Sequence, residues 1–187
     1  MVHPDSPIHL HYLSLALDEA KECEPTPTAF CVGCIINVPS QNSLSSSKTD
    51  EPFAAVTLST GYSRELSGNT HAEANALSKA YELSTADLQA ILGTSTTPED
   101  AQTHLTELLS HADVYTTMEP CSVRLSGLGP CADALIKAKV RRCFIGVGEP
   151  ADFVQCEGAR KLIEAGIEVV WLKGMEEECL EVARRGH

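Results

Sequence analysis

The chain has 187 residues, of which 43% are hydrophobic, and it carries a formal net charge of −12. This length and apolar content predict one domain with a full core, spanning residues 1–187. The acidic charge opposes extended contact with a phosphate backbone, which argues against a nucleic-acid partner.

The N-terminal half predicts one helix followed by a strand pair. An amphipathic helix is expected over residues 7–23, and the prolines that follow it from Pro25 onward end it. Strands are predicted over residues 30–38 and 54–60. The Ser-rich stretch between them, about residues 39–52, predicts a hairpin loop and not a linker between domains.

From residue 72 onward the pattern alternates between helices and strands. Helices are predicted over 72–80, 85–110 with a break near 93–98, 132–138, 156–165 and 175–184, and strands over 114–118, 142–147 and 167–172. This order predicts an α/β fold with three layers (α/β/α). At its centre we expect a five-stranded mixed sheet, mostly parallel, with helices on both faces.

No apolar run approaches the length of a membrane span, and the first residues lack a signal-peptide pattern, so we expect no membrane partner. The chain contains eight cysteines. Because the chain shows neither a membrane-span run nor a signal-peptide pattern, we interpret the cysteines as metal ligands and free thiols and not as disulfides. The expected location is the cytoplasm, with the nucleus as an alternative.

Two short segments separated by roughly fifty residues carry potential zinc ligands. His71 comes first, and Cys121 and Cys131 follow, each directly after a proline. One histidine and two cysteines are one ligand fewer than a closed tetrahedral zinc site requires. The remaining position would hold a water whose pKa zinc lowers. The pattern therefore predicts a catalytic Zn²⁺ bound by His71, Cys121 and Cys131.

Glu73 follows His71 by two residues and is not needed as a ligand. Together the three ligands and this carboxylate form the H-x-E…P-C…C pattern typical of zinc-dependent nucleobase deaminases. We predict that Glu73 carries protons during the reaction. His71 and Glu73 are expected in the first turn of one helix, and Cys131 at the start of another, so the positive ends of both helices would favour thiolates.

A structural zinc site is the alternative interpretation of the same residues. It would need a fourth protein ligand, and Cys31, Cys34 and Cys143 are candidates by residue type. The repeated context of a strand followed by a helix favours the catalytic interpretation.

The chain resembles the cytidine deaminase superfamily, and within it the pyrimidine deaminases of riboflavin biosynthesis, of the fungal type with a single activity. The matching segments are Phe30-Cys31-Val32-Gly33-Cys34, His71-Ala72-Glu73-Ala74, Met118-Glu119-Pro120-Cys121-Ser122, Pro130-Cys131-Ala132-Asp133-Ala134 and residues 158–169. The resemblance implies a hydrolytic deaminase with a cytidine deaminase-like fold. The implied substrate is 2,5-diamino-6-ribitylamino-4(3H)-pyrimidinone 5′-phosphate, which would lose its 2-amino group as ammonia.

Three departures from the bacterial relatives support the fungal type. Those relatives have Pro-Asn-Pro where this chain has Thr28-Ala29-Phe30, and their loop between the cysteines is shorter and contains a histidine. Here that loop spans residues 122–130 and carries Arg124. The bacterial proteins also continue into a reductase domain, which is not expected for a chain ending at His187. These differences imply that the ribose is reduced before deamination.

Five residues are predicted to contact the substrate. The backbone N–H groups of Ala72 and of Ser122 or Cys121 are candidate donors at helix starts, and the resemblance adds Thr28. Arg64 and Arg124 are the basic residues nearest the ligands in sequence, so they are candidates for the phosphate, with surface salt bridges as the alternative. Glu119 is expected to hold the loop of Cys121, with substrate contact as the alternative.

Two other functions fit the same motifs. The protein could deaminate another small base or nucleoside, such as cytosine, cytidine or guanine, or it could be a catalytically silent zinc-binding subunit. The presence of Glu73 argues against the silent subunit. The resemblance also implies a homodimer, because members of this superfamily usually associate through helices that flank the site.

Overall fold

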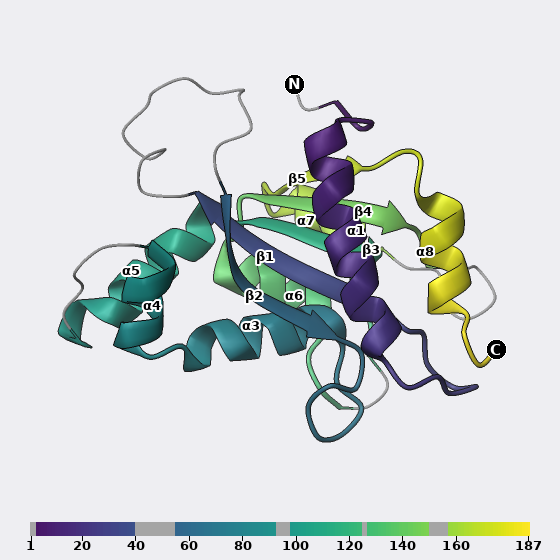
Figure 1. Ribbon diagram of the computed structural model, residues 1–187, viewed down its shortest axis with the longest axis horizontal. Helices are drawn as coiled ribbons and strands as arrows, with labels where there is room; N and C mark the ends of the chain where they lie inside the picture. Colours follow the sequence, from purple (N-terminus) through teal and green to yellow (C-terminus); the bar gives the residue numbers. More distant parts are fainter. Residues whose placement is uncertain (1–2, 40–54, 93–97, 125–126, 150–156) are drawn as a thin grey trace.

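The computed structural model describes residues 3–39, 55–92, 98–124, 127–149 and 157–187. Its centre is a five-stranded sheet with the strand order β2-β1-β3-β4-β5 (Figure 1). The strands are β1 (Gly33–Pro39), β2 (Ala55–Tyr62), β3 (Asp113–Met118), β4 (Arg142–Val147) and β5 (Glu168–Trp171). The predicted Ser-rich hairpin loop lies almost wholly outside the described residues.

The sheet is mixed, as predicted, but it is not mostly parallel. Strand β1 pairs antiparallel with both β2 and β3, whereas β3, β4 and β5 are parallel to one another. The expectation of a mostly parallel sheet is wrong because β1, which lies between β2 and β3, runs opposite to both of them. The parallel strands follow the rule that a helix connects each of them to the next.

Seven helices are seen in the described residues. They are α1 (Pro7–Glu22), α3 (Ala72–Glu82), α4 (Thr85–Leu92), α5 (Pro98–Ser110), α6 (Cys131–Ala138), α7 (Gly158–Glu164) and α8 (Glu176–Ala183). The predicted break in the region 85–110 is confirmed, since α4 and α5 are separate helices. In none of the described helices is there a segment of the length and apolar character that a membrane span requires.

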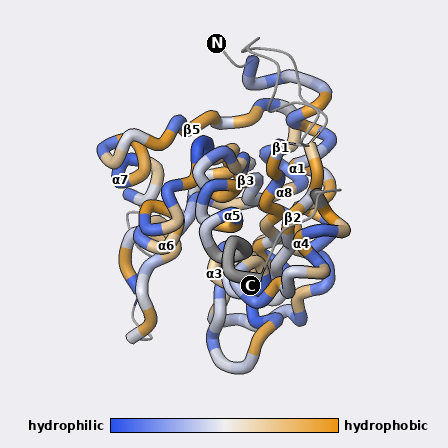
Figure 2. The backbone as a smooth tube through the Cα atoms, turned by 90° about the vertical axis from the view of Figure 1, so that its left-hand side faces the viewer, coloured by the Kyte–Doolittle hydropathy of each residue, from blue (hydrophilic) through white to orange (hydrophobic). Residues whose placement is uncertain are grey.

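The helices cover both faces of the sheet, so the predicted three layers are confirmed (Figure 1). Alternate strand residues face opposite sides: Ile36, Val114 and Ile145 pack with α3 to α7. Tyr115 and Phe144, each one position away from these, pack with α1 and α8. Hydrophobic and hydrophilic residues alternate along the helices, which is the pattern expected of helices with one buried face (Figure 2).

Candidate active site

Three side chains that lie far apart in the sequence meet at the starts of α3 and α6. His71 is the residue before α3, Cys131 is the first residue of α6, and Cys121 follows β3. The Nδ1 atom of His71 lies 3.5 Å from Sγ of Cys121 and 3.6 Å from Sγ of Cys131. All three candidate ligand atoms lie within 4.8 Å of one another, and no other group of this kind occurs among the described residues.

These separations fit one tetrahedral zinc ion. Zinc lies about 2.3 Å from cysteine sulfur and about 2.0–2.1 Å from histidine nitrogen, which at a tetrahedral angle places the nitrogen and the sulfur about 3.6 Å apart. The two observed nitrogen–sulfur distances agree with this value. The residue types and the geometry therefore fit zinc with three protein ligands.

His71 itself does not lie in the first helical turn, contrary to the expectation from sequence. It is the N-cap of α3, with an extended backbone (φ −105°, ψ 156°). Its carbonyl still accepts a hydrogen bond from the backbone N–H of Asn75, at 2.9 Å. The extended conformation explains how its ring can point toward the cysteines while Glu73 occupies the helix proper.

The two cysteines share hydrogen bonds that favour negative charge on Cys121. The backbone N–H of Cys131 donates to Sγ of Cys121 at 3.3 Å. Hydrogen bonds from the Cys131 thiol and from His71 lower the pKa of Cys121 to about 4. The hydrogen bond to Cys121 raises the pKa of Cys131 well above the usual value of a thiol. A cation is therefore needed for both sulfurs to be thiolates at once, which supports a metal at this position.

Helix α7 holds the turn that carries Cys121. A Cβ atom at Gly158 would lie 1.7 Å from the carbonyl oxygen of Pro120, so only glycine permits this close approach. Glu119 accepts a hydrogen bond from the backbone N–H of Ala159 at 2.9 Å. Glu119 thus has the structural contact that we expected, but it binds the first turn of α7 and not the backbone of the Cys121 loop.

Glu73 lies beside the three-residue cluster and is almost fully buried, with 3% of its surface exposed. Burial in the protein interior raises the pKa of its carboxyl group above the usual value. The hydroxyl of Thr116 lies 3.4 Å from one carboxylate oxygen, at the long limit of a hydrogen bond. A carboxyl group with a raised pKa is suited to accept and return protons near neutral pH.

A buried asparagine fixes the start of α3, and the sequence analysis missed it. The side chain of Asn75 donates to the carbonyl of Tyr62 at 2.7 Å and to the hydroxyl of Thr70 at 3.0 Å. These bonds tie the loop before His71 to the end of β2. The signal in the sequence was an asparagine within a run of alanines, because asparagine is a poor helix former and needs a partner when it is buried.

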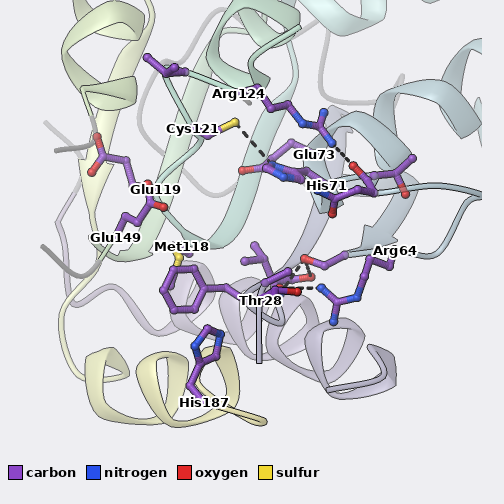
Figure 3. A pocket seen from close by; sticks show the side chains of 17 residues that line it. Thr28, Arg64, His71, Glu73, Met118, Glu119, Cys121, Arg124, Glu149 and His187 are labelled. Carbon is purple, nitrogen blue, oxygen red and sulfur yellow. Dashed lines mark hydrogen bonds between the residues drawn. The ribbon is translucent and has the colours of Figure 1, made fainter. Parts of the chain in front are cut away.

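A pocket of about 240 Å³ opens over the cluster. Its lining includes His71, Glu73 and Cys121, and it is bordered by both basic and acidic side chains. The border residues labelled in Figure 3 are Thr28, Arg64, Met118, Glu119, Arg124, Glu149 and His187. In this view Glu119 and Glu149 lie beside Met118, whereas Arg64 and Arg124 lie on the other side of the pocket.

The two arginines border the pocket as predicted, but each also binds backbone carbonyls. Arg64 donates to the carbonyls of Phe30 and Glu24 and to Sγ of Cys23, so it holds the segment between α1 and β1. Arg124 donates to the carbonyls of Asn69 and Gly129. Arg124 thereby joins the loop between the cysteines to the loop before α3.

The other predicted contact residues have different positions. Thr28 borders the pocket. Ala72 is the first residue of α3, so its backbone N–H is among those that a helix leaves without an intrahelical partner. The residue is also fully buried. The hydroxyl of Ser122 accepts a hydrogen bond from the backbone N–H of Glu157 at 3.1 Å, which orients that side chain toward the segment before α7.

No additional cysteine joins the cluster of His71, Cys121 and Cys131 within the described part of the chain. Cys31, Cys34 and Cys143 are fully buried and lie outside the cluster. Burial raises the pKa of Cys34 and of Cys143, as expected for inert thiols in an apolar core. The geometry thus favours a site with three protein ligands over a closed structural site.

Comparison with known proteins connects this geometry to a family. The family described as "cytidine and deoxycytidylate deaminase zinc-binding region" matches residues 7–147. The diaminohydroxyphosphoribosylamino-pyrimidine deaminase of Schizosaccharomyces pombe is 40% identical over 179 residues, covering 96% of this chain and 36% of that protein. The chain therefore spans about a third of the length of this relative.

Solved structures show the same similarity. The Rib2 deaminase of Aspergillus oryzae at pH 4.6 superposes with a TM-score of 0.73 and 36% identity, covering 97% of this chain and 93% of that one. A structure of that deaminase in complex with DARIPP gives a TM-score of 0.72 at 34% identity, covering 99% and 92%. The deaminase/reductase of Thermotoga maritima, with a TM-score of 0.63 and 21% identity over 94% of this chain and 39% of that one, supports the fold alone.

Proposed function

Because the chain belongs to the cytidine and deoxycytidylate deaminase family, we propose that it is a zinc-dependent hydrolase that removes an amino group from a phosphorylated pyrimidine in riboflavin biosynthesis. The proposed substrate is 2,5-diamino-6-ribitylamino-4(3H)-pyrimidinone 5′-phosphate, which loses its 2-amino group as ammonia. The observation that carries the proposal is the buried Glu73 beside three residues whose spacing fits zinc.

His71, Cys121 and Cys131 would hold the metal in this proposal. Zinc, when bound, supplies a Lewis acid and lowers the pKa of a water ligand, so that a nucleophile is available near neutral pH. The starts of α3 and α6 point at this position, and their positive ends favour the thiolates of the two cysteines. The hydrogen bond from the backbone of Cys131 to Cys121 orients one ligand toward the other.

Glu73 would carry the protons. Its carboxylate accepts a proton from the attacking water and passes it to the ring nitrogen next to the amine-bearing carbon, which makes that carbon more electrophilic. It then takes the remaining proton of the hydroxyl added to that carbon and delivers it to the amine, so that the C–N bond breaks, ammonia leaves and a carbonyl forms. Burial of Glu73 supports this role, because its raised pKa brings the protonated and ionised forms closer in energy at neutral pH.

Two backbone groups, one at the start of α3 and one in the loop after β3, would complete the site. We assign the N–H of Ala72 as a donor to the pyrimidine ring, and that of Cys121 or Ser122 as a donor to the oxygen that develops negative charge. Both positions adjoin the ligands, His71 and Cys121. Donors held in place before the reaction stabilise developing charge without the cost of reorganisation.

The substrate's sugar provides the first test. If reduction precedes deamination, the enzyme should act more efficiently on the ribitylamino substrate than on its ribosylamino counterpart. Protein groups left without partners by the wrong sugar each cost roughly 1–3 kcal/mol, so we expect a difference of about tenfold or more in kcat/KM. Ammonia release from both compounds measures this ratio, and equal values would contradict the proposed order.

Arg124 is the stronger of the two arginine candidates for the phosphate. Both arginines bind carbonyls, but Arg64 has four partners in the segment between α1 and β1, which favours a role in holding the pocket wall. We expect Arg124→Ala to raise KM by about tenfold with little change in kcat, because the phosphate is bound alike in the ground and transition states. Steady-state kinetics on zinc-loaded protein checks this.

The matched control for Arg124 is Arg160→Ala. Arg160 lies on the surface of α7, where it pairs with Glu157 and Glu164, and its replacement should leave both constants unchanged. An unchanged KM in the Arg124→Ala protein would move the phosphate site elsewhere and leave the zinc chemistry intact.

Two further functions remain as competing proposals. A deaminase of cytosine, cytidine or guanine would share the ligands and Glu73, and a silent zinc-binding subunit would share only the ligands. Ammonia release measured against a panel of pyrimidines and purines separates the three.

We also propose a homodimer that acts in the cytoplasm. The exposed apolar side chains of Tyr81 and Leu128, which border grooves along α3 and α6, support association there, and sedimentation would test it.

A further inference from the structure

The central strand β3 places a fully buried hydroxyl group next to Glu73. Thr116 pairs with Cys34 of β1 on one side and with Ile145 of β4 on the other, so its backbone is held from both edges. It lies two residues after Val114, which packs with α3 to α7, and alternate strand residues face the same side. The side chain of Thr116 therefore faces the layer that contains α3, and none of its surface is exposed.

The Thr116 hydroxyl has two oxygen neighbours. It donates to the carbonyl of Met118 at 2.9 Å, and it lies 3.4 Å from Oε1 of Glu73. A hydroxyl carries one proton that it can donate and lone pairs that can accept. While it donates to Met118, it can accept a hydrogen bond from a protonated carboxyl group. When it turns toward Glu73 instead, it can donate to the ionised carboxylate. One hydroxyl therefore fits both forms of the Glu73 side chain.

The proposed reaction needs Glu73 in both forms. Its carboxylate takes a proton and later returns one, so the same oxygen atoms must stay in place as acceptors and as donors. Rotation of the Thr116 O–H bond follows this change without moving any heavy atom. The separation of 3.4 Å is long for a bond between two oxygens, but contacts of catalytic groups are often long until the substrate binds.

The Cys131 thiol also donates a hydrogen bond to the Glu73 carboxyl group. In the proposed site, however, Cys131 binds zinc as a thiolate and has no proton to donate. The hydroxyl of Thr116 stays neutral and keeps its proton whether or not zinc is bound. Of these two contacts to the carboxyl group, only the one from Thr116 therefore persists in the zinc-loaded protein.

We propose that Thr116 is a positioning residue, whose hydroxyl keeps the Glu73 carboxyl group in the orientation that its proton transfers require. The inference rests on the proposed function and deepens it. The described lining of the pocket includes Glu73 but not Thr116, so Thr116 acts through Glu73 and not by touching the substrate. Its contribution should therefore appear in kcat and leave KM unchanged.

Two substitutions at this position test the inference, with kcat calculated per zinc-loaded chain. Thr116→Val keeps the branched shape but removes the hydroxyl, and we expect kcat for the ribitylaminopyrimidine phosphate to fall about tenfold at unchanged KM. Thr116→Ser keeps the hydroxyl and should retain most of the wild-type kcat. The matched control is Thr57→Val, which removes a hydroxyl that donates to Asn37 on the far strand pair β1–β2, at 3.0 Å. It should change neither constant.

A double variant shows whether Thr116 acts through Glu73. In Glu73→Gln protein the side chain no longer transfers protons, so the added Thr116→Val should lower the residual kcat by less than about twofold. The Met118 carbonyl loses its donor in both backgrounds, so a purely structural effect would be the same in both. Single-turnover ammonia release measures the slow variants.

Three results would overturn the inference. The first is a wild-type kcat in Thr116→Val, and the second is an equal loss in Thr116→Ser and Thr116→Val, because the hydroxyl would then not matter. The third is a tenfold loss from Thr116→Val in the Glu73→Gln background as well, which would mean that Thr116 acts independently of Glu73. If the wild-type protein itself released no ammonia, the proposed function would fail, and this result is distinct from the other three.

Discussion

Replacing Glu73 by glutamine is expected to lower kcat by at least about a hundredfold while the fold and the zinc content stay unchanged. Glutamine has nearly the same size and helix propensity, so α3 should still form. It cannot accept a proton from water or return one to the amine. Burial of the side chain also prevents bulk solvent from taking over the transfer. Steady-state ammonia release and metal analysis on the same preparation would measure both effects.

The matched control for this variant is Glu82→Gln. Glu82 lies at the exposed end of the same helix, so its replacement changes the net charge equally without touching the pocket. It should retain wild-type kcat. Near-normal turnover in zinc-loaded Glu73→Gln protein would remove the residue from the mechanism and with it the proposed deaminase reaction.

The second large effect is expected for the metal. In Cys131→Ser, most of the zinc should be lost, because a serine hydroxyl is a far weaker ligand than a thiolate. Activity should fall in parallel. Elemental analysis of the purified protein gives the zinc content per chain, and circular dichroism shows whether α6 persists.

Cys179→Ser separates the loss of a ligand from the cost of burying a hydroxyl. Cys179 is also fully buried, but it belongs to α8 and lies in the core on the other face of the sheet, packed with residues of α1. This variant is expected to lose some stability and to keep its zinc. Full retention of zinc in Cys131→Ser would mean that another residue is the ligand.

Local sequence patterns were sufficient to predict the elements and the cluster of His71, Cys121 and Cys131. His71 and Cys131 lie where a helix begins and Cys121 lies just after a strand ends, and such boundaries leave signals within a few residues. The five strands and the break between α4 and α5 were predicted for the same reason. The direction of β1 was not, because antiparallel pairing with β3 depends on which strand the hairpin packs against.

Contacts between distant segments could not be predicted. The approach of Gly158 to Pro120 joins residues far apart in the chain, and nothing near either residue indicates the other. The same holds for the partners of Arg64, which lie between α1 and β1, and for the position of His187 on Phe30. A basic residue near a ligand in sequence therefore indicates the rim of the pocket, but not which atoms its guanidinium binds.

The most direct test of the account is the dependence of ammonia release on zinc, measured with the ribitylaminopyrimidine phosphate in ¹⁸O-labelled water. Protein treated with a chelator should be inactive, and activity should return in proportion to added zinc until about one ion is bound per chain. The product should carry one solvent oxygen at the carbon that held the amine. Undiminished turnover by metal-free protein, or product without the label, would contradict zinc-dependent hydrolysis.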